Sequence, residues 1–282
     1  MRLKDILVHL DATEQGATRL RLAADLARRQ DAHLIGLFVA DIRLPVMVTP
    51  DPGGGAILLG DLVDTLRGRA LAEAAQVEAA FQDALLREGI AGEWRQIEGL
   101  APETVALHAR YADLVIIGQA DPESTQPAAG AILEAALFSS GRPVLVVPYA
   151  GRFERLGERV LIGWNASREA SRAVHDALPV IAGASAVTVL SVDPRGGLAG
   201  HGEEPGADIA RHLARHGLRV TVEHMTGTGI GADNALQNRA AELSADLLVI
   251  GAYGHSRIRE LILGGVTRTL LREMTVPVLL SH

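Results

Sequence analysis

Two pairs of glycines stand close together within residues 251–269, which read GAYGHSRIRELILGGVTRT. They directly follow the apolar run ADLLVI at residues 245–250, which is typical of a buried strand. A strand that ends in a glycine turn and leads into a helix presents free backbone N–H groups at the carboxyl edge of a sheet. Phosphate suits such a place, because glycine lets an anion approach closely and the helix start adds a favourable dipole. The spacing therefore predicts a phosphate-binding loop, and a loop shaped only for a tight helix contact is the alternative.

The composition is that of a globular protein large enough for two domains. The chain has 282 residues, of which 48% are hydrophobic and 22% are charged. Its formal net charge of −7 argues against general nucleic-acid binding, which needs a basic surface. It has no cysteine, which excludes disulfides, a thiol nucleophile and cysteine zinc sites. No apolar run reaches the roughly 20 residues of a membrane span, and the start reads as a strand and not as a signal peptide, so we expect a cytoplasmic protein.

An internal repeat divides the chain into two halves. The matching segments, first half before second, are DILVHLD (5–11) and RVLIGWN (159–165), YADLVIIGQ (111–119) and SADLLVIGA (244–252), and GRPVLVVP (141–148) and TVPVLLSH (275–282). Repeats of this size are two domains of one fold, because the repeats of a solenoid are shorter. We therefore expect one domain at residues 1–150 and a second at residues 157–282.

Short β-branched runs alternate with helical stretches in each half. In the second half the expected strands are residues 160–164, 186–192, 219–225, 246–250 and 276–281, and the expected helices are 168–181, 207–216, 233–243 and 266–273. Continuously apolar strands that are separated by helices indicate a parallel sheet covered on both faces. We therefore predict an α/β, Rossmann-like fold for each half, in which ligands bind beyond the carboxyl ends of the strands.

The first half contains a long connection that the second half lacks. Residues 41–61 include prolines and three consecutive glycines, which predict a surface loop. Residues 62–88 follow as one long amphipathic helix. The last strands of the two halves, residues 144–147 and 276–281, are expected at the edges of their sheets, where apolar strands invite pairing.

With these features the chain resembles the universal stress protein family, in its tandem two-domain form. Nucleotide-binding members of that family carry Gly-x2-Gly-x9-Gly-Ser/Thr after the fourth strand of a five-stranded parallel sheet. Gly251, Gly254 and Gly264 fit this spacing, and the apolar strands before and after them are in place. The resemblance implies the adenine nucleotide alpha hydrolase-like fold in both halves. It also implies that the edge strands pair the two halves into an internal pseudo-dimer, and a homodimer of chains is a further expectation.

The resemblance also implies how the second half would hold a triphosphate. Gly251 and Gly254 would shape the turn around it. Gly264, Gly265 and Val266 would present backbone N–H groups to phosphate oxygens at the helix start. The family has Ser or Thr where Gly265 stands, so one hydroxyl is missing here while the backbone N–H remains.

Four further positions complete the implied site. Thr267 would supply a hydroxyl that compensates for Gly265, and Ile250 ends the strand beneath the ligand. Val192 ends the second strand, where the backbone would bond to adenine. Asn165 stands near adenine or ribose in place of the family's usual aspartate, and its amide is a mixed donor and acceptor without charge.

Two charged or polar side chains near the glycines are further candidates for phosphate contacts. His255 follows Gly254, and Arg268 lies in the expected helix, where a guanidinium suits phosphate. Ordinary exposure to solvent is the alternative for both. His212 and His216 have the i, i+4 spacing of a metal-binding pair on a helix, and a solvated helix face is the interpretation that we favour.

The first half departs from the family pattern. Asp121 stands where the second glycine of the motif belongs, and Glu123 is close to it. Carboxylates at this place would repel a triphosphate, although Asp11 keeps the family's acidic residue after the first strand. We therefore expect the first half to be a partner domain that does not bind ATP.

These observations predict a regulatory protein of the stress response and not an enzyme. The second domain would bind ATP, or ADP or AMP, with Mg²⁺ as a companion of the phosphates, and its occupancy would alter contacts with a protein partner. An interaction scaffold that binds no nucleotide and a slow ATPase are the two alternatives, since the α/β fold by itself does not establish a function.

Overall fold

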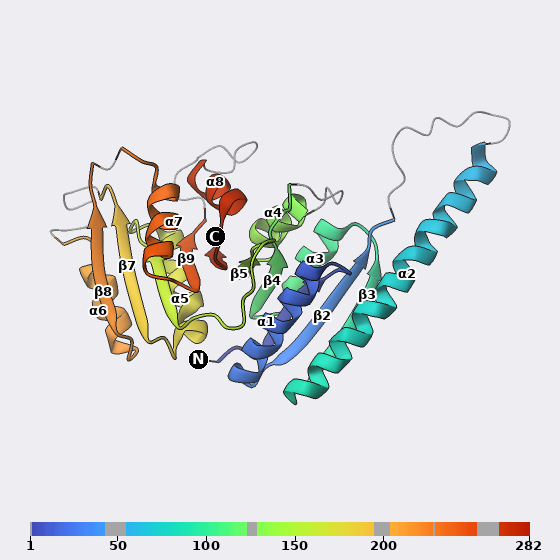
Figure 1. Cartoon of the computed structure of the whole chain (residues 1–282), viewed down its shortest axis with the longest axis horizontal. Coiled ribbons are helices and arrows are strands. Elements are labelled where there is room, and N and C mark those ends of the chain that lie inside the picture. Colours follow the sequence, from blue (N-terminus) through green and yellow to red (C-terminus); the bar gives the residue numbers. More distant parts are fainter. Residues whose placement is uncertain (1, 43–54, 123–128, 195–203, 228, 253–264) are drawn as a thin grey trace.

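The computed structural model describes residues 2–42, 55–122, 129–194, 204–227, 229–252 and 265–282 (Figure 1). The elements of the first half are β1 (Asp5–Leu10), α1 (Glu14–Gln30), β2 (His33–Ala40), α2 (Gly55–Glu88), β3 (Gly92–Glu98), α3 (Ala101–Ala109), β4 (Leu114–Gly118), α4 (Ala129–Ser139) and β5 (Val144–Val147). Those of the second half are β6 (Arg159–Gly163), α5 (Arg168–Ile181), β7 (Ala186–Val192), α6 (Ala207–Arg215), β8 (Val220–Met225), α7 (Ala232–Glu242), β9 (Leu247–Gly251), α8 (Gly265–Glu273) and β10 (Val278–Ser281).

All ten of these strands form one sheet, in the order β3-β2-β1-β4-β5-β10-β9-β6-β7-β8. Within each half the five strands are parallel. The halves meet where β5 pairs antiparallel with β10, with Leu145 opposite Leu279 near the centre of the joint. The predicted α/β fold is confirmed, and the two predicted edge strands pair with each other inside the chain.

Helices cover both faces of the sheet, and each apolar layer continues across the joint between the halves. One face packs against α1, α2, α5 and α6 through a single cluster of side chains that includes Leu26, Phe81, Val174 and Leu213. The other face packs against α3, α4, α7 and α8 through a cluster that includes Val105, Ala136, Leu236 and Leu270. The strand residues alternate between the two clusters, as the period of two in a strand requires. No helix of the described chain is long and apolar enough to cross a bilayer.

The predicted elements of the second half agree with the structure to within one or two residues. The prediction for residues 41–61 is wrong in its last part, because α2 already begins at Gly55. The high content of helix-forming residues in this helix outweighs the cost of Gly60 within it. Residues 43–54, the remainder of the predicted loop, lie outside the described residues.

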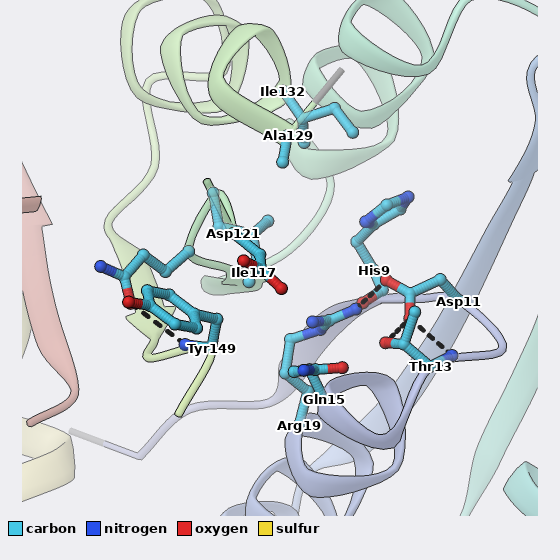
Figure 2. A pocket seen from close by; sticks show the side chains of 12 residues that line it. His9, Asp11, Thr13, Gln15, Arg19, Ile117, Asp121, Ala129, Ile132 and Tyr149 are labelled. Carbon is cyan, nitrogen blue, oxygen red and sulfur yellow. Dashed lines mark hydrogen bonds and ion pairs between the residues drawn. The ribbon is translucent and has the colours of Figure 1, made fainter. Parts of the chain in front are cut away.

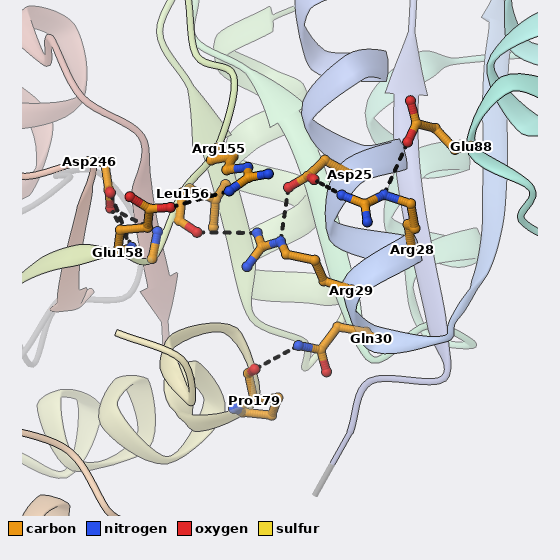
Figure 3. Close-up of polar contacts among 11 residues, drawn as sticks. Asp25, Arg28, Arg29, Gln30, Glu88, Arg155, Leu156, Glu158, Pro179 and Asp246 are labelled. Carbon is orange, nitrogen blue, oxygen red and sulfur yellow. Dashed lines mark hydrogen bonds and ion pairs between the residues drawn. The ribbon is translucent and has the colours of Figure 1, made fainter. Parts of the chain in front are cut away.

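Polar contacts at the base of α1 tie the first half to the second (Figure 3). The Arg29 guanidinium donates to the carbonyl of Leu156 at 3.2 Å and is held by Asp25 at 2.9 Å. The Gln30 amide donates to the carbonyl of Pro179 in α5 at 2.7 Å. These bonds reach main-chain acceptors on the far side of the joint, so they fix the halves relative to each other in addition to the strand pairing.

One aspartate in each half fastens the start of that half's first strand. Asp246, just before β9, accepts hydrogen bonds from the backbone N–H groups of Gly157, Glu158 and Arg159 at 2.7–3.1 Å. Asp113, at the matching place before β4, accepts from Lys4 and Asp5 at 2.7 and 3.1 Å. The Ala-Asp-Leu repeat in the sequence therefore marks a structural clamp, which satisfies backbone donors that lie beyond the strand ladder.

Replacing Asp246 by Ala should lower the free energy of unfolding by about 2 kcal/mol, because three backbone N–H groups lose their acceptor. Asp113→Ala should cost about two thirds as much, since it leaves two donors without a partner. Asp208→Ala is the control, because the side chain of Asp208 is 97% exposed and pairs only within α6. Urea titrations of the three variants test this order, and an Asp246→Ala variant as stable as Asp208→Ala would contradict it.

Candidate functional site

The order of the strands reverses at one place in each half. The reversal lies between β1 and β4 in the first half and between β6 and β9 in the second. Parallel α/β sheets bind ligands beyond the carboxyl ends of the strands at such a switch point. The predicted site residues Asn165, Ile250 and Gly251 all lie at the switch point of the second half, directly after β6 or at the end of β9.

The exit from β6 is held in a defined shape by local hydrogen bonds. The Asn165 side-chain oxygen accepts from the backbone N–H of Ser167 at 3.1 Å, and the Ser167 hydroxyl caps α5 by accepting from Ala170 N–H at 3.1 Å. Between them Ala166 has a φ of 55°, which is uncommon for a residue with a side chain. Asn165 is therefore fixed at the sheet edge by the turn that starts α5, and its amide nitrogen is available as a donor.

Gly251 lies against the first turn of α5, far away in the sequence. A Cβ atom at Gly251 would stand 2.3 Å from the backbone nitrogen of Ala170 and 2.5 Å from the carbonyl carbon of Glu169. No side chain fits at such distances, because backbone atoms cannot move aside without unfolding the turn. Gly251 therefore makes the tight helix contact that the sequence analysis named as the alternative to phosphate binding. This contact does not exclude a role of Gly251 in binding a ligand.

The next described element after β9, the helix α8, starts at the same edge. α8 begins at Gly265, so Gly265, Val266 and Thr267 form its first turn, whose backbone N–H groups have no partner within the helix. Thr267 is buried and Arg268 is exposed. Val192 ends β7, the strand next to β6. The remaining predicted residues, Gly254, His255 and Gly264, lie outside the described residues.

The switch point of the first half, where Asp121 replaces the second glycine of the motif, holds a largely buried ion pair. The guanidinium of Arg19 from α1 pairs with the Asp11 carboxylate and donates to the carbonyl of His9 at 3.1 Å (Figure 2). Asp11 also accepts from the backbone N–H of Thr13 at 3.0 Å. The Arg19 side chain is only 5% exposed, so a charged group fills the end of the sheet.

Gly118 makes room for this arginine. A Cβ atom at Gly118 would stand 2.3 Å from Arg19 Nη1, so the same glycine position faces a side chain in the first half and a helix backbone in the second. The repeat places Gly163 and Ala173 opposite His9 and Arg19. Arg19 and His9 were not predicted as site residues, and this difference between the two repeats is the signal that would have identified them.

A cavity of about 100 Å³ remains beside the ion pair (Figure 2). Its polar lining consists of His9, Asp11, Thr13, Gln15, Arg19, Gln119, Asp121 and Tyr149. A cavity of this size is well below the several hundred Å³ that a nucleotide-sized ligand needs. Asp121, which stands where the second glycine of the family motif belongs, lines this cavity.

The ion pair and burial set the charges around this cavity. Burial, and next the Arg19 guanidinium, lower the pKa of His9 to about 4, against an opposing effect of Asp11. Burial would raise the pKa of Asp11, but Arg19 and the hydrogen bonds from Thr13 outweigh it and hold that pKa below its usual value. His9 is therefore neutral and Asp11 charged at neutral pH.

His212 and His216 have the sequence spacing of a metal-binding pair, and in the structure a third histidine, His175, lies near them. The ring centroids of His212 and His216 lie 4.8 Å apart, and His175 from α5 lies 5.0 Å from His212. Even so, no group of three or more His, Cys, Asp or Glu side chains within the described ranges is arranged to hold a metal ion. Partial burial, which is the largest cause, and the neighbouring charges lower the pKa of His212.

We expect His9 to make the protein less stable in mild acid. The pKa of His9 is lower in the folded protein than in the unfolded chain, so the unfolded chain binds more protons between pH 6.5 and about 4. Stability from this group is complete above pH 6.5 and is lost as the pH falls through that interval, by up to about 3 kcal/mol. His9→Gln should flatten this part of the pH profile in urea unfolding, and a slope equal to that of the wild type would show that His9 is not buried as a neutral group.

The chain is similar to known proteins over nearly its whole length. Residues 157–282 match the model of the universal stress protein family. A universal stress protein from Synechocystis sp. (strain ATCC 27184 / PCC 6803 / Kazusa) is 26% identical, and the match covers 98% of this chain and 99% of the relative.

Solved structures show the same fold over the whole length. A universal stress protein from Archaeoglobus fulgidus DSM 4304 matches with a TM-score of 0.72 and 19% identity, over 98% of this chain and 95% of that one. A protein of unknown function from Pseudomonas aeruginosa PAO1 matches with a TM-score of 0.57 and 16% identity, over 99% and 92%. Together with the repeat and the strand order, these matches show that residues 157–282 match the universal stress protein family and that the whole chain is similar to universal stress proteins of the same length and fold.

Proposed function

We propose that the second half binds one adenine nucleotide, with its phosphates at the start of α8. This proposal is supported by three features that lie at one edge of the sheet. β9 ends at Gly251 against the start of α5, Asn165 is fixed beside it, and α8 opens at Gly265 after the glycine-bearing loop. ATP is the nucleotide we propose, with ADP and AMP as alternatives and Mg²⁺ as a companion of the phosphates.

The start of α8 suits an anion for electrostatic reasons. Its first turn contains no acidic residue, as in α2 and α4, whereas α1, α3, α5, α6 and α7 each carry Asp or Glu there. An acidic side chain in the first turn would offset the helix dipole and compete with phosphate for the backbone N–H groups. Arg268 is exposed in the same turn and adds positive charge. Gly265, Val266 and Thr267 would supply the N–H groups, and Gly254, Gly264 and His255 would follow the phosphates in the preceding loop.

The base and sugar would lie toward β6 and β7. These strands are neighbours, and the backbone N–H of Trp164 donates to the carbonyl of Leu190 at 2.9 Å, which keeps their ends together. Val192 ends β7, so its backbone can bond to adenine, and the amide of Asn165 can bond to adenine or ribose. Ile250 is buried at the end of β9 and forms the floor beneath them.

We propose that the first half binds no nucleotide. Arg19 and Asp11 fill the end of its sheet, and the remaining cavity is about 100 Å³. Asp121 adds a second carboxylate at the place that phosphate would occupy. Opening this site would require breaking a buried ion pair, which costs more than an exposed pair because the charges lose their partners in a poorly solvated place.

The biological role that we propose is that of a cytoplasmic regulatory protein of the stress response, in which nucleotide occupancy alters contacts with a protein partner. We propose no enzymatic function, and slow hydrolysis of ATP is the alternative. β5 and β10 pair within the chain, so a homodimer of chains would have to use another surface, such as the outer strands β3 and β8.

Denaturing the freshly purified protein and analysing released nucleotide by mass spectrometry should give close to one adenine nucleotide per chain. The expected ratio follows from a nucleotide site in the second half alone. A ratio near two would contradict the proposal for the first half. A protein that is isolated empty and shows no heat of binding with millimolar ATP, ADP or AMP would contradict the nucleotide proposal itself and favour the scaffold.

Replacing Gly254 by Leu should weaken ATP binding by at least tenfold while the fold survives, because a side chain in the loop would stand where phosphate approaches. Gly183→Leu is the matched control, since a Cβ atom at Gly183 would meet no other atom within 4 Å and would lie far from this edge of the sheet. Isothermal titration calorimetry measures both. Equal affinities in the two variants would contradict the proposed place of the phosphates.

A further inference from the structure

A glutamine from the first half holds the end of α8 in the second. Gln119 follows β4 and is 6% exposed. Its amide nitrogen donates to the carbonyls of Leu271 and Arg272 at 2.9 and 3.0 Å, and its side-chain oxygen accepts from the backbone N–H of Tyr149 at 3.0 Å. The side chain therefore connects the end of β4, the segment after β5 and the last turn of α8.

The two carbonyls are ones that a helix cannot satisfy by itself. The last four C=O groups of an α-helix have no partner within the helix, and Leu271 and Arg272 belong to the last four residues of α8. Gln119 therefore caps α8 from another domain. Both donor hydrogens of its amide and one acceptor position are used, so the orientation of the amide is determined by its partners.

The contact has no counterpart on the other side of the joint. The repeat places Ala252 opposite Gln119, and both residues make the same backbone bond, Gln119 N–H to Val147 at 2.8 Å and Ala252 N–H to Ser281 at 2.9 Å. An alanine has no amide, so Ala252 cannot cap α4 as Gln119 caps α8. The capping contact therefore exists in one direction only among the described residues. A residue of the first half, whose switch point holds the ion pair, caps a helix of the second half.

The position of the end of α8 also determines the position of its start. α8 has nine residues, so its two ends are only about 12 Å apart, and a helix this short moves as a rigid body. Leu270, Leu271 and Met274 anchor its C-terminal part in the core, and α7 packs beside it. A change at Gln119 would therefore shift the backbone N–H groups of Gly265 and Val266.

We propose that Gln119 is a positioning residue through which the first half sets the phosphate site of the second. The proposal rests on the function proposed above, in which phosphate binds at the start of α8. It gives the first half a definite role, because the Gln119 amide is held by the backbone N–H of Tyr149, and both residues line the cavity beside Arg19. Adenine and ribose lie away from α8 in this arrangement, and their binding does not depend on Gln119.

The test compares ATP with adenosine, which has no phosphate. Gln119→Ala and Gln119→Met should each weaken ATP binding on the order of tenfold, as expected for the loss of two buried hydrogen bonds that position the helix. Adenosine affinity should stay within about twofold of the wild type, since the base and sugar keep their contacts. The methionine variant keeps the volume of the side chain and removes only the hydrogen bonds, so it serves if the alanine variant does not fold. Calorimetry on the full chain measures both ligands.

Gln30→Ala is the matched control. The Gln30 amide also donates to a carbonyl of the other half, that of Pro179 at 2.7 Å, but it does not touch α8. The control should lose stability and keep both affinities. A Gln119 variant that binds ATP as the wild type does, or that loses ATP and adenosine equally, would overturn the proposal. A wild-type protein that binds neither ligand would overturn the proposed function, and that result appears before any variant is made.

Discussion

The antiparallel pairing of β5 with β10 is the contact on which the rest of this molecule depends. Each half alone would end in an apolar edge strand with unpaired backbone groups, which is prone to pair with other chains. Joining these edges inside one chain satisfies the backbone of both and makes a single ten-stranded sheet. The joint also makes both apolar layers continuous, so that helices of the two halves share one core on each face. Gln119 can reach α8 only because the strands between them are paired in this register.

The two halves have diverged at the place where their fold offers a ligand site. In the first, Arg19 and Asp11 fill the switch point, and their mutual attraction offsets the cost of burying two charges. In the second, Gly163 and Ala173 stand at the matching positions of His9 and Arg19, and the edge consists of Asn165, Gly251 and the start of α8. The matching edges of the two halves therefore differ in charge, because an ion pair lies at the first and positions 163 and 173 of the second carry no charged side chain.

Side chains of the first half hold elements beyond it in place. The polar contacts across the joint run mainly to main-chain carbonyls. Arg29 reaches Leu156, Gln30 reaches Pro179, and Gln119 reaches Leu271 and Arg272. Main-chain acceptors exist whatever the side chains are, so such contacts hold the position of an element and constrain its sequence little.

The sequence by itself determined the duplication, the α/β alternation and the boundaries of most elements, because periodicity and apolar runs are local properties of the chain. It also placed Asn165, Ile250 and Gly251 at one sheet edge, since the carboxyl ends of parallel strands must meet there. It raised a tight helix contact for the glycines but not the partner of Gly251, the backbone of Ala170, and it gave no sign that Arg19 fills the first switch point or that Gln119 caps α8. Each of these joins residues far apart in the chain, and whether two such groups meet depends on the register of the strands and the packing of helices, which only the tertiary structure decides.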